Sequence, residues 1–169
     1  MPDSELLARI EAGEPAVKAG NPTAEKVYHK YVIVDLSGSG YAIPAESVRE
    51  IVMDVPVHYL PFVPPYIRGL VNRHGEPYTA IDLNVLFRKD AASGELTLLV
   101  LNIENDRLAL VTSGVREIVR VEETLVFPIS ENEDEAAFLM GTVRVGDNDI
   151  FIVSIEGVQK KMEADLGSS

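Results

Sequence analysis

The chain has 169 residues, of which 46% are hydrophobic, and this combination suits one domain with a tail and argues against wholesale disorder. Its net charge of −12 repels nucleic-acid phosphates and anionic membrane surfaces, so it argues against a nucleic-acid-binding function. The absence of cysteine excludes disulfides, thiolate nucleophiles and cysteine–zinc sites.

Residues 1–27 are expected to form a flexible N-terminal tail. A short helix near its start would place Leu6, Leu7 and Ile10 on one side, but an isolated helix of that length is marginal in water. The first residues lack the basic and apolar regions of a secretory signal, and the longest aliphatic run, Leu98–Leu101, is far too short to cross a bilayer. The sequence therefore predicts a cytoplasmic protein.

Short strands and tight turns follow from Tyr28. In chain order we expect a strand over 31–36, a turn over 37–40, a returning strand over 41–43, and a helical turn after Pro44 that leads into a strand containing Val48, Ile51 and Val52. Four prolines between residues 55 and 66 exclude a central strand there and favour an extended crossing.

The next elements complete the first part of the pattern. They are a strand over 67–71, a turn over 72–77, a strand over 78–81, and a short helix over 83–87 for which Asp82 is a suitable N-cap.

The chain then repeats itself at an offset of 67 residues. Val48-Arg49-Glu50-Ile51-Val52 recurs as Val115-Arg116-Glu117-Ile118-Val119, and residues 31–44 align with 98–111. After a shift of five residues, Gly69 aligns with Gly141 and Asp82 with Ser154. Two copies predict one domain built from two similar halves, about 31–87 and 98–160, and not a solenoid.

The second half repeats the predicted elements. We expect strands over 98–103 and 108–111 around a turn at 104–107, and a C-terminal helix capped by Ser154 with Ile155, Val158, Met162 and Leu166 at helical spacing. Acidic residues between 131 and 135 lie in the five-residue insertion and predict a solvated loop. Two small β-barrels that share an apolar seam are expected, with the first strands of one half closing the other barrel.

The residues that could support catalysis or metal binding do not form a recognisable catalytic or metal-binding motif. The three histidines, at positions 29, 58 and 74, are not at metal-ligand spacing, and residues 37–40 lack the lysine and helix of a phosphate loop. Asp82 could be a general base but has the position of a helix cap. These observations favour a binding protein without enzymatic activity, cofactor or metal.

Several motifs occur in a fixed order: Tyr41-Ala42-Ile43-Pro44, Val48-x-Glu50-Ile51, Leu60-Pro61, Pro64-Pro65-Tyr66-Ile67-x-Gly69-Leu70-Val71-Asn72, Gly75 and Ile81-Asp82-Leu83. In this order and separation they resemble the CheW family of chemotaxis coupling proteins, over roughly residues 28–158. The Val-x-Glu-Ile and Gly-x-x-Asn-x-x-Gly motifs at this separation are quite specific.

The resemblance implies an all-β fold over residues 28–166. It consists of two SH3-like five-stranded barrels in a pseudo-twofold arrangement, with a shared apolar core and short helices that include a C-terminal one. It also implies a non-enzymatic adaptor that couples the cytoplasmic tips of chemoreceptors to the regulatory domain of the histidine kinase CheA, with contacts to other CheW-like proteins as a further expectation.

Site residues follow from the resemblance by position. The implied receptor groove contains Val48, Glu50, Gly69, His74, Ala109, Val115 and Ile118. The implied kinase contact contains Gly75, Pro77 and Tyr78. The apolar members of the groove would take the hydrophobic face of a receptor helix. The alternative interpretation is that Val48, Ile51, Val115 and Ile118 are core residues, which their repetition in both halves favours for some of them.

The sequence departs from the family pattern at the turn after residue 71. The family usually has Asn-Leu-Arg-Gly, whereas this chain has Asn72-Arg73-His74-Gly75. Alternation along a strand predicts that Arg73 points away from the side on which His74 lies. Three other hypotheses remain: an adaptor of a different receptor–kinase pathway for surface motility or gene regulation, an enzyme with an unrecognised site, and an SH3-like nucleic-acid binder.

Overall fold

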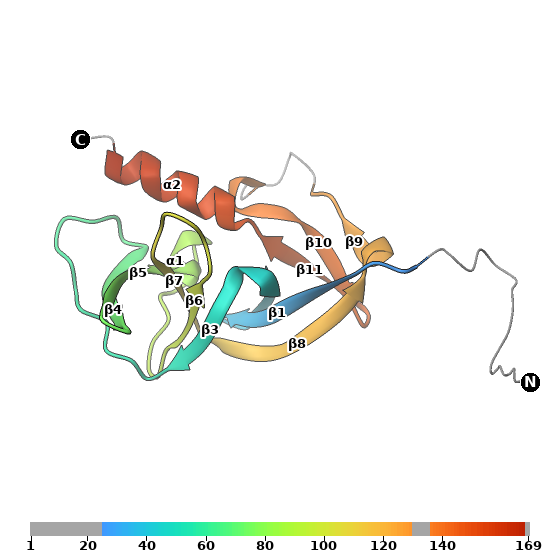
Figure 1. The fold of residues 1–169 in the computed structure, drawn as a ribbon, viewed down its shortest axis with the longest axis horizontal. Coiled ribbons are helices and arrows are strands. Elements are labelled where there is room, and N and C mark those ends of the chain that lie inside the picture. The colour runs from blue at the N-terminus through green and yellow to red at the C-terminus, as the bar shows by residue number, and fades with distance from the viewer. Residues whose placement is uncertain (1–24, 130–135, 168–169) are drawn as a thin grey trace, which may run out of the picture.

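The computed structural model describes residues 25–129 and 136–167, and these residues form two β-sheets (Figure 1). One sheet, the first barrel, contains β3 (Val48–Met53), β4 (Ile67–Arg73), β5 (Glu76–Asp82), β6 (Thr97–Leu101) and β7 (Leu108–Thr112). Its strand order is β3-β6-β7-β5-β4. The expected tail up to residue 24 and the acidic loop at 131–135 lie outside the described residues.

The other sheet, the second barrel, contains β1 (Tyr28–Leu36), β2 (Ser39–Pro44), β8 (Gly114–Glu122), β9 (Val126–Phe127), β10 (Leu139–Val145) and β11 (Asn148–Val153). Its order is β8-β1-β2-β11-β10-β9. The two-residue strand β9 adds to the five strands expected. The helices are α1 (Leu83–Leu86), α2 (Ile155–Gly167) and three single 3₁₀ turns at Ala45–Ser47, Glu123–Leu125 and Ala136–Phe138.

Each half of the repeat lends its first hairpin to the other barrel. The β1–β2 hairpin comes from the first half, yet β1 pairs with β8 of the second half. In the same way the β6–β7 hairpin of the second half pairs with β3 and β5 of the first. The predicted exchange of first strands is therefore confirmed. Because neither barrel can close without the other half, the two barrels form one folding unit.

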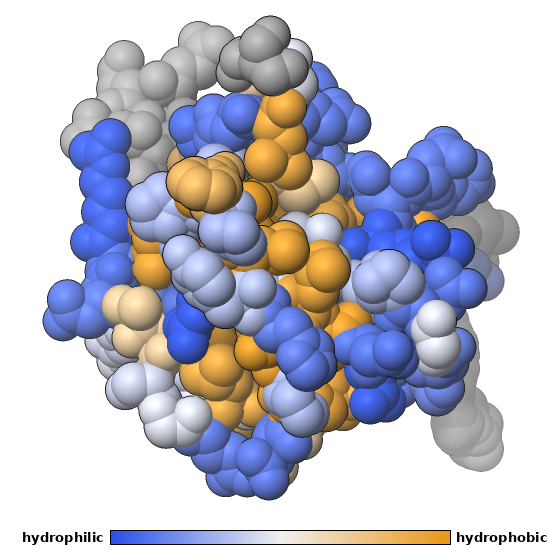
Figure 2. Space-filling model, turned by 90° about the vertical axis from the view of Figure 1, so that its left-hand side faces the viewer, coloured by the Kyte–Doolittle hydropathy of each residue, from blue (hydrophilic) through white to orange (hydrophobic). Residues whose placement is uncertain are grey.

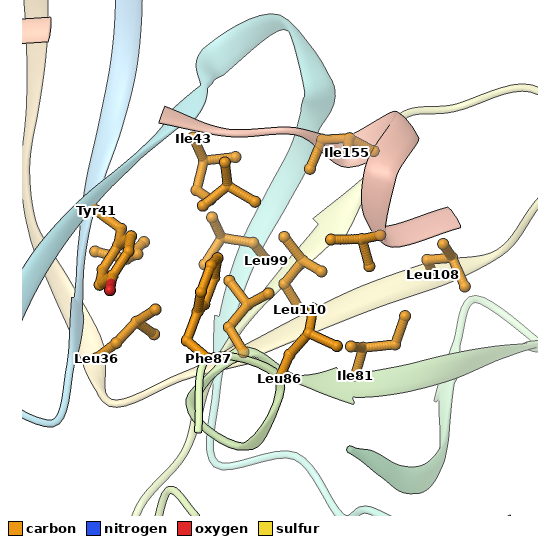
Figure 3. Close-up of a cluster of buried hydrophobic side chains, with 14 of the residues drawn as sticks. Leu36, Tyr41, Ile43, Ile81, Leu86, Phe87, Leu99, Leu108, Leu110 and Ile155 are labelled. Atoms are coloured by element: carbon orange, nitrogen blue, oxygen red, sulfur yellow. The ribbon is translucent and has the colours of Figure 1, made fainter. Parts of the chain in front are cut away.

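Three apolar clusters follow from this exchange. One lies in the first barrel around Val71, Val100 and Val111, and another lies in the second barrel around Ile33 and Ile152. The largest cluster, which we call the shared seam, joins both barrels and the helices. Its fully buried members include Leu36, Ile43, Ile81, Leu99 and Leu110 (Figure 3). The predicted shared apolar core is confirmed.

The two predicted helix caps form as expected. The Asp82 carboxylate accepts a hydrogen bond from the Asn84 amide at 2.9 Å, and the Ser154 hydroxyl accepts one from the Gly157 amide at 3.0 Å. Asp82 is fully buried and is also paired with Arg68 at 2.7 Å. These contacts agree with its role as a cap.

Helix α2 starts in the second half but lies along the first barrel (Figure 1). Ile155, Val158 and Met162 are buried in the shared seam, whereas Leu166, which was expected on the same face, is half-exposed. The hydroxyl of Tyr66 donates to Asp165 Oδ2 at 2.6 Å and fixes the end of the helix. The helix therefore adds a further connection between the two halves.

Candidate functional site

Three polar side chains meet across the open edge between β3 and β4 of the first barrel. Arg73 donates through Nε to Glu50 Oε1 at 3.0 Å and through Nη2 to Oε2 at 3.3 Å. His74 Nε2 lies 3.5 Å from Glu50 Oε1. We call Glu50, Arg73 and His74 the Glu50 cluster. It ties together two strands that are neighbours in the barrel but are not paired in the sheet.

The Glu50 cluster fixes the charge on its carboxylate. The hydrogen bond from Arg73 lowers the pKa of Glu50, partial desolvation opposes this effect, and the charges of Arg73 and His74 lower the pKa further. Glu50 is therefore ionised at neutral pH. The cluster presents a carboxylate that is held in one position by a two-pronged arginine contact, with the exposed imidazole of His74 beside it.

The prediction that Arg73 and His74 point to opposite sides is wrong, and the turn explains why. Arg73 pairs with Glu76, so only two residues form the loop of the hairpin. Both have positive φ, 54° at His74 and 80° at Gly75, which is the backbone of a type I′ turn. The strand alternation ends at this turn, and His74 folds back toward Glu50. Asn72 Oδ1 accepts a hydrogen bond from the Gly75 amide at 3.2 Å and supports the turn.

The predicted receptor-groove residues separate into surface and interior positions. Glu50 and His74 lie together, Val48 and Val115 are half-buried against the shared seam, and Ile118 is 58% exposed on β8. The surface positions thus come from both barrels, on either side of the seam.

Two other predicted groove residues are buried. Ala109 is fully buried inside the first barrel, opposite Ala80 on β5, so direct contact of its side chain with a partner is excluded in this conformation. Gly69 is also buried, because the segment after β3 crosses directly over it. A Cβ atom at Gly69 would lie 2.0 Å from the carbonyl oxygen of His58. At Gly141 the distance to the Phe127 oxygen would be 2.4 Å, so the same need explains the repeated glycine.

The residues predicted for the kinase contact lie on the same hairpin. Gly75 and Pro77 are exposed, and Tyr78 is 6% exposed, with its ring in the core of the first barrel. Tyr78 therefore offers little surface to a partner, and its hydroxyl accepts a hydrogen bond from Arg49 Nη1 at 2.8 Å. Pro77 and Tyr78 line an open cavity of about 580 Å³ that also has Arg49 and Met162 in its wall.

Sequence reasoning missed two features of this end of the molecule. Arg49 was visible in the repeated motif but was not assigned a role. The proline-rich crossing displays Tyr59 and Phe62, which are 79% and 103% exposed, next to the exposed Met53. Figure 2 views this end of the molecule and shows hydrophobic surface between hydrophilic borders. The proline density indicated a fixed crossing, although it could not indicate which side chains face solvent.

Within the described residues, no three histidine, aspartate or glutamate side chains are grouped so that they could hold a metal ion. The helices of the same residues are too short or too polar for a transmembrane span. What the described surface offers is a fixed ionic cluster, an adjacent cavity and exposed apolar side chains, and these are the elements of a protein-binding surface.

Comparisons with known proteins agree with this architecture. Residues 30–162 match the model of the family described as CheW-like domain. The chemotaxis protein CheW of Klebsiella aerogenes is 26% identical over 146 residues, which cover 84% of this chain and 88% of the relative. CheW of Helicobacter pylori is 26% identical over 72% of this chain and 75% of the relative.

A solved structure has the same fold. The crystal structure of the scaffolding protein TtCheW from Thermoanaerobacter tengcongensis superposes with a TM-score of 0.72 at 25% sequence identity, covering 76% of this chain and 90% of that chain. The family match spans both barrels and most of α2, so this chain belongs to the CheW-like domain family.

Proposed function

We propose that this chain is a non-enzymatic, cytoplasmic adaptor that couples chemoreceptors to the histidine kinase CheA. The observation that carries the proposal is the Glu50 cluster, which holds a charged group at the open edge between β3 and β4 of the first barrel in a CheW-like domain. A body with binding residues on several faces is suited to joining proteins, and the resemblance of this chain's motifs to the CheW family supports receptors and a kinase as the joined proteins.

The receptor contact is proposed at the surface that the two barrels share. Val48 and Val115 supply apolar contacts beside the seam, and Ile118 extends them on β8. A receptor tip is a helical hairpin in this proposal, and the apolar face of one helix would lie along these residues. Glu50 and His74 would then pair with polar groups of the helix and fix its direction.

The kinase contact is proposed at the hairpin turn and the cavity beside it. Gly75 and Pro77 are exposed there, and Tyr78 contributes its hydroxyl edge. The partner is the regulatory domain of CheA, and other CheW-like proteins are further partners. In this proposal the receptor and kinase contacts involve different residues, so that the chain holds both partners together.

Substitution of Glu50 by lysine tests the receptor contact. The change replaces a fixed carboxylate with a cation next to Arg73, so we expect loss of receptor-tip binding in a titration followed by calorimetry. Glu163→Lys on the exposed side of α2 is the matched control, since it changes the net charge equally and should bind as wild type does. Thermal unfolding of each variant separates loss of contact from loss of fold. Undiminished binding by folded Glu50→Lys would overturn the groove assignment.

A further inference from the structure

The duplicated motif places an arginine at the same structural position in each barrel. Both arginines are the extra residue of a β-bulge: Arg49 where the β3–β6 register shifts, and Arg116 where the β8–β1 register shifts. Arg116 Nη2 is neutralised within the chain, because it pairs with Asp35 Oδ1 at 2.6 Å and donates to the carbonyl of Gly38 at 2.9 Å.

Arg49 lacks the corresponding carboxylate. The repeat offset of 67 aligns Asp35 with Asn102, and Arg49 does approach that residue, with Nη2 3.5 Å from Asn102 Oδ1. Its other contact is the hydroxyl of Tyr78. Both partners are neutral, and Arg49 makes no ion pair with any residue in 25–129 or 136–167. Among the described residues, the amide in place of a carboxylate therefore leaves the guanidinium without a countercharge.

Arg49 is exposed and lies in the wall of an open, concave surface. The cavity of about 580 Å³ also has Pro77, Ile103 and Met162 in its wall, among polar residues. Its other charged groups already have partners: Arg107 pairs with Glu76 at 2.8 Å, and Asp106 accepts a hydrogen bond from Gln159 at 2.7 Å. Of the two arginines in this wall, Arg49 is thus the one with no carboxylate partner among the described residues, so it is the one that can accept a new carboxylate.

We propose that Arg49 binds an acidic side chain of the kinase regulatory domain, and this proposal rests on the proposed function. A partner that covers the cavity removes water from Arg49, and an unpaired charge in such a place is strongly unfavourable. A carboxylate satisfies the planar guanidinium with two parallel hydrogen bonds, which neither Tyr78 nor Asn102 can provide. The recognised segment therefore carries an aspartate or glutamate, flanked by apolar residues that contact Pro77 and Met162.

Three variants with the same net charge test this inference. Arg49→Gln removes the guanidinium, Asn102→Asp supplies an internal countercharge like that of Asp35, and Arg116→Gln removes the duplicate arginine. Each makes the net charge of −12 more negative by one, so nonspecific charge effects are matched. Binding to the regulatory domain of the cognate CheA is measured by calorimetry, with a receptor-tip fragment as the second ligand.

We expect Arg49→Gln and Asn102→Asp each to weaken kinase binding about tenfold or more, which is the effect of removing one member of a desolvated charge pair. Arg116→Gln should bind as wild type does. Equal losses for Arg49→Gln and Arg116→Gln, or no loss for folded Arg49→Gln and Asn102→Asp, would overturn the inference. A loss of receptor binding alone would overturn the choice of partner. Failure of wild type to bind either protein would instead contradict the proposed function.

A second measurement does not depend on the kinase. Glutarate serves as a soluble carboxylate probe, and the guanidinium signals are followed by NMR in the full chain. The Arg49 signal should shift in wild type and stay unchanged in Asn102→Asp, while the Arg116 signal should stay unchanged in both. A shift of Arg116 equal to that of Arg49 would show that the internal pairing makes no difference, and the inference would be wrong.

Discussion

Replacing Gly69 with alanine distinguishes a structural role of this glycine from a role in partner binding. Gly69 has φ +143°, a backbone conformation that costs other residues about 1–3 kcal/mol. The new Cβ would lie 2.0 Å from the His58 carbonyl oxygen, so the crossing segment must move. That movement breaks two hydrogen bonds between His58 and Leu70, each 2.8 Å long and each worth about 1 kcal/mol.

The expected loss is therefore about 3–5 kcal/mol of unfolding free energy, or roughly 10 °C in Tm for a domain of this size. Urea denaturation and thermal unfolding measure it. Gly94→Ala is the control, because Gly94 also has positive φ, +73°, but has nothing within 4 Å of an added Cβ. It should lose about 1–2 kcal/mol from strain alone. Equal losses at both glycines, or lost receptor binding by Gly69→Ala without lost stability, would refute the reasoning.

Two further predictions concern the C-terminal helix and the seam. Tyr66→Phe should reduce stability most at neutral pH: the Tyr66 hydrogen bond lowers the pKa of Asp165, so its contribution exists above the unfolded pKa near 3.9 and is lost as pH falls through the folded value. Urea titrations at pH 7 and 3 should show this difference shrinking in acid, and a constant difference would contradict it. Leu99→Ala should cost about 2–5 kcal/mol and lower the single unfolding transition of both barrels together; two separate transitions would contradict a shared seam.

The repeat carried most of the fold prediction because its physical causes are local and occur twice. Asp82 and Ser154 both cap helices, and Gly69 and Gly141 both lie under a crossing segment. Helix capping and close backbone approach can be recognised in the sequence, since few residue types satisfy them. The shared apolar seam also followed from the repeat, because each small half buries too little surface alone.

The site was harder to predict because it depends on contacts between residues far apart in the sequence. The position of His74 is set by a type I′ turn, in which histidine replaces the usual asparagine, so alternation gave the wrong side. The alternation of side chains along a strand also does not indicate how deeply each one is buried. It could not show that Ala109 is interior while Ile118 is exposed. Arg49 and Arg116 lie in identical motifs, but their environments differ because Arg49 approaches Asn102 and Arg116 pairs with Asp35. Both of these partners are distant in sequence, so the motifs alone could not indicate the difference.

The adaptor function is tested most directly by a three-component titration of the full chain with the cognate CheA regulatory domain and a receptor-tip fragment. Sedimentation velocity would follow the formation of each pair and of all three together. We predict saturable binding of each partner and a ternary complex in which this chain contacts both, with Glu50→Lys losing the receptor and Arg49→Gln weakening the kinase. Binding of the two partners that is mutually exclusive, or binding of neither, would contradict the account.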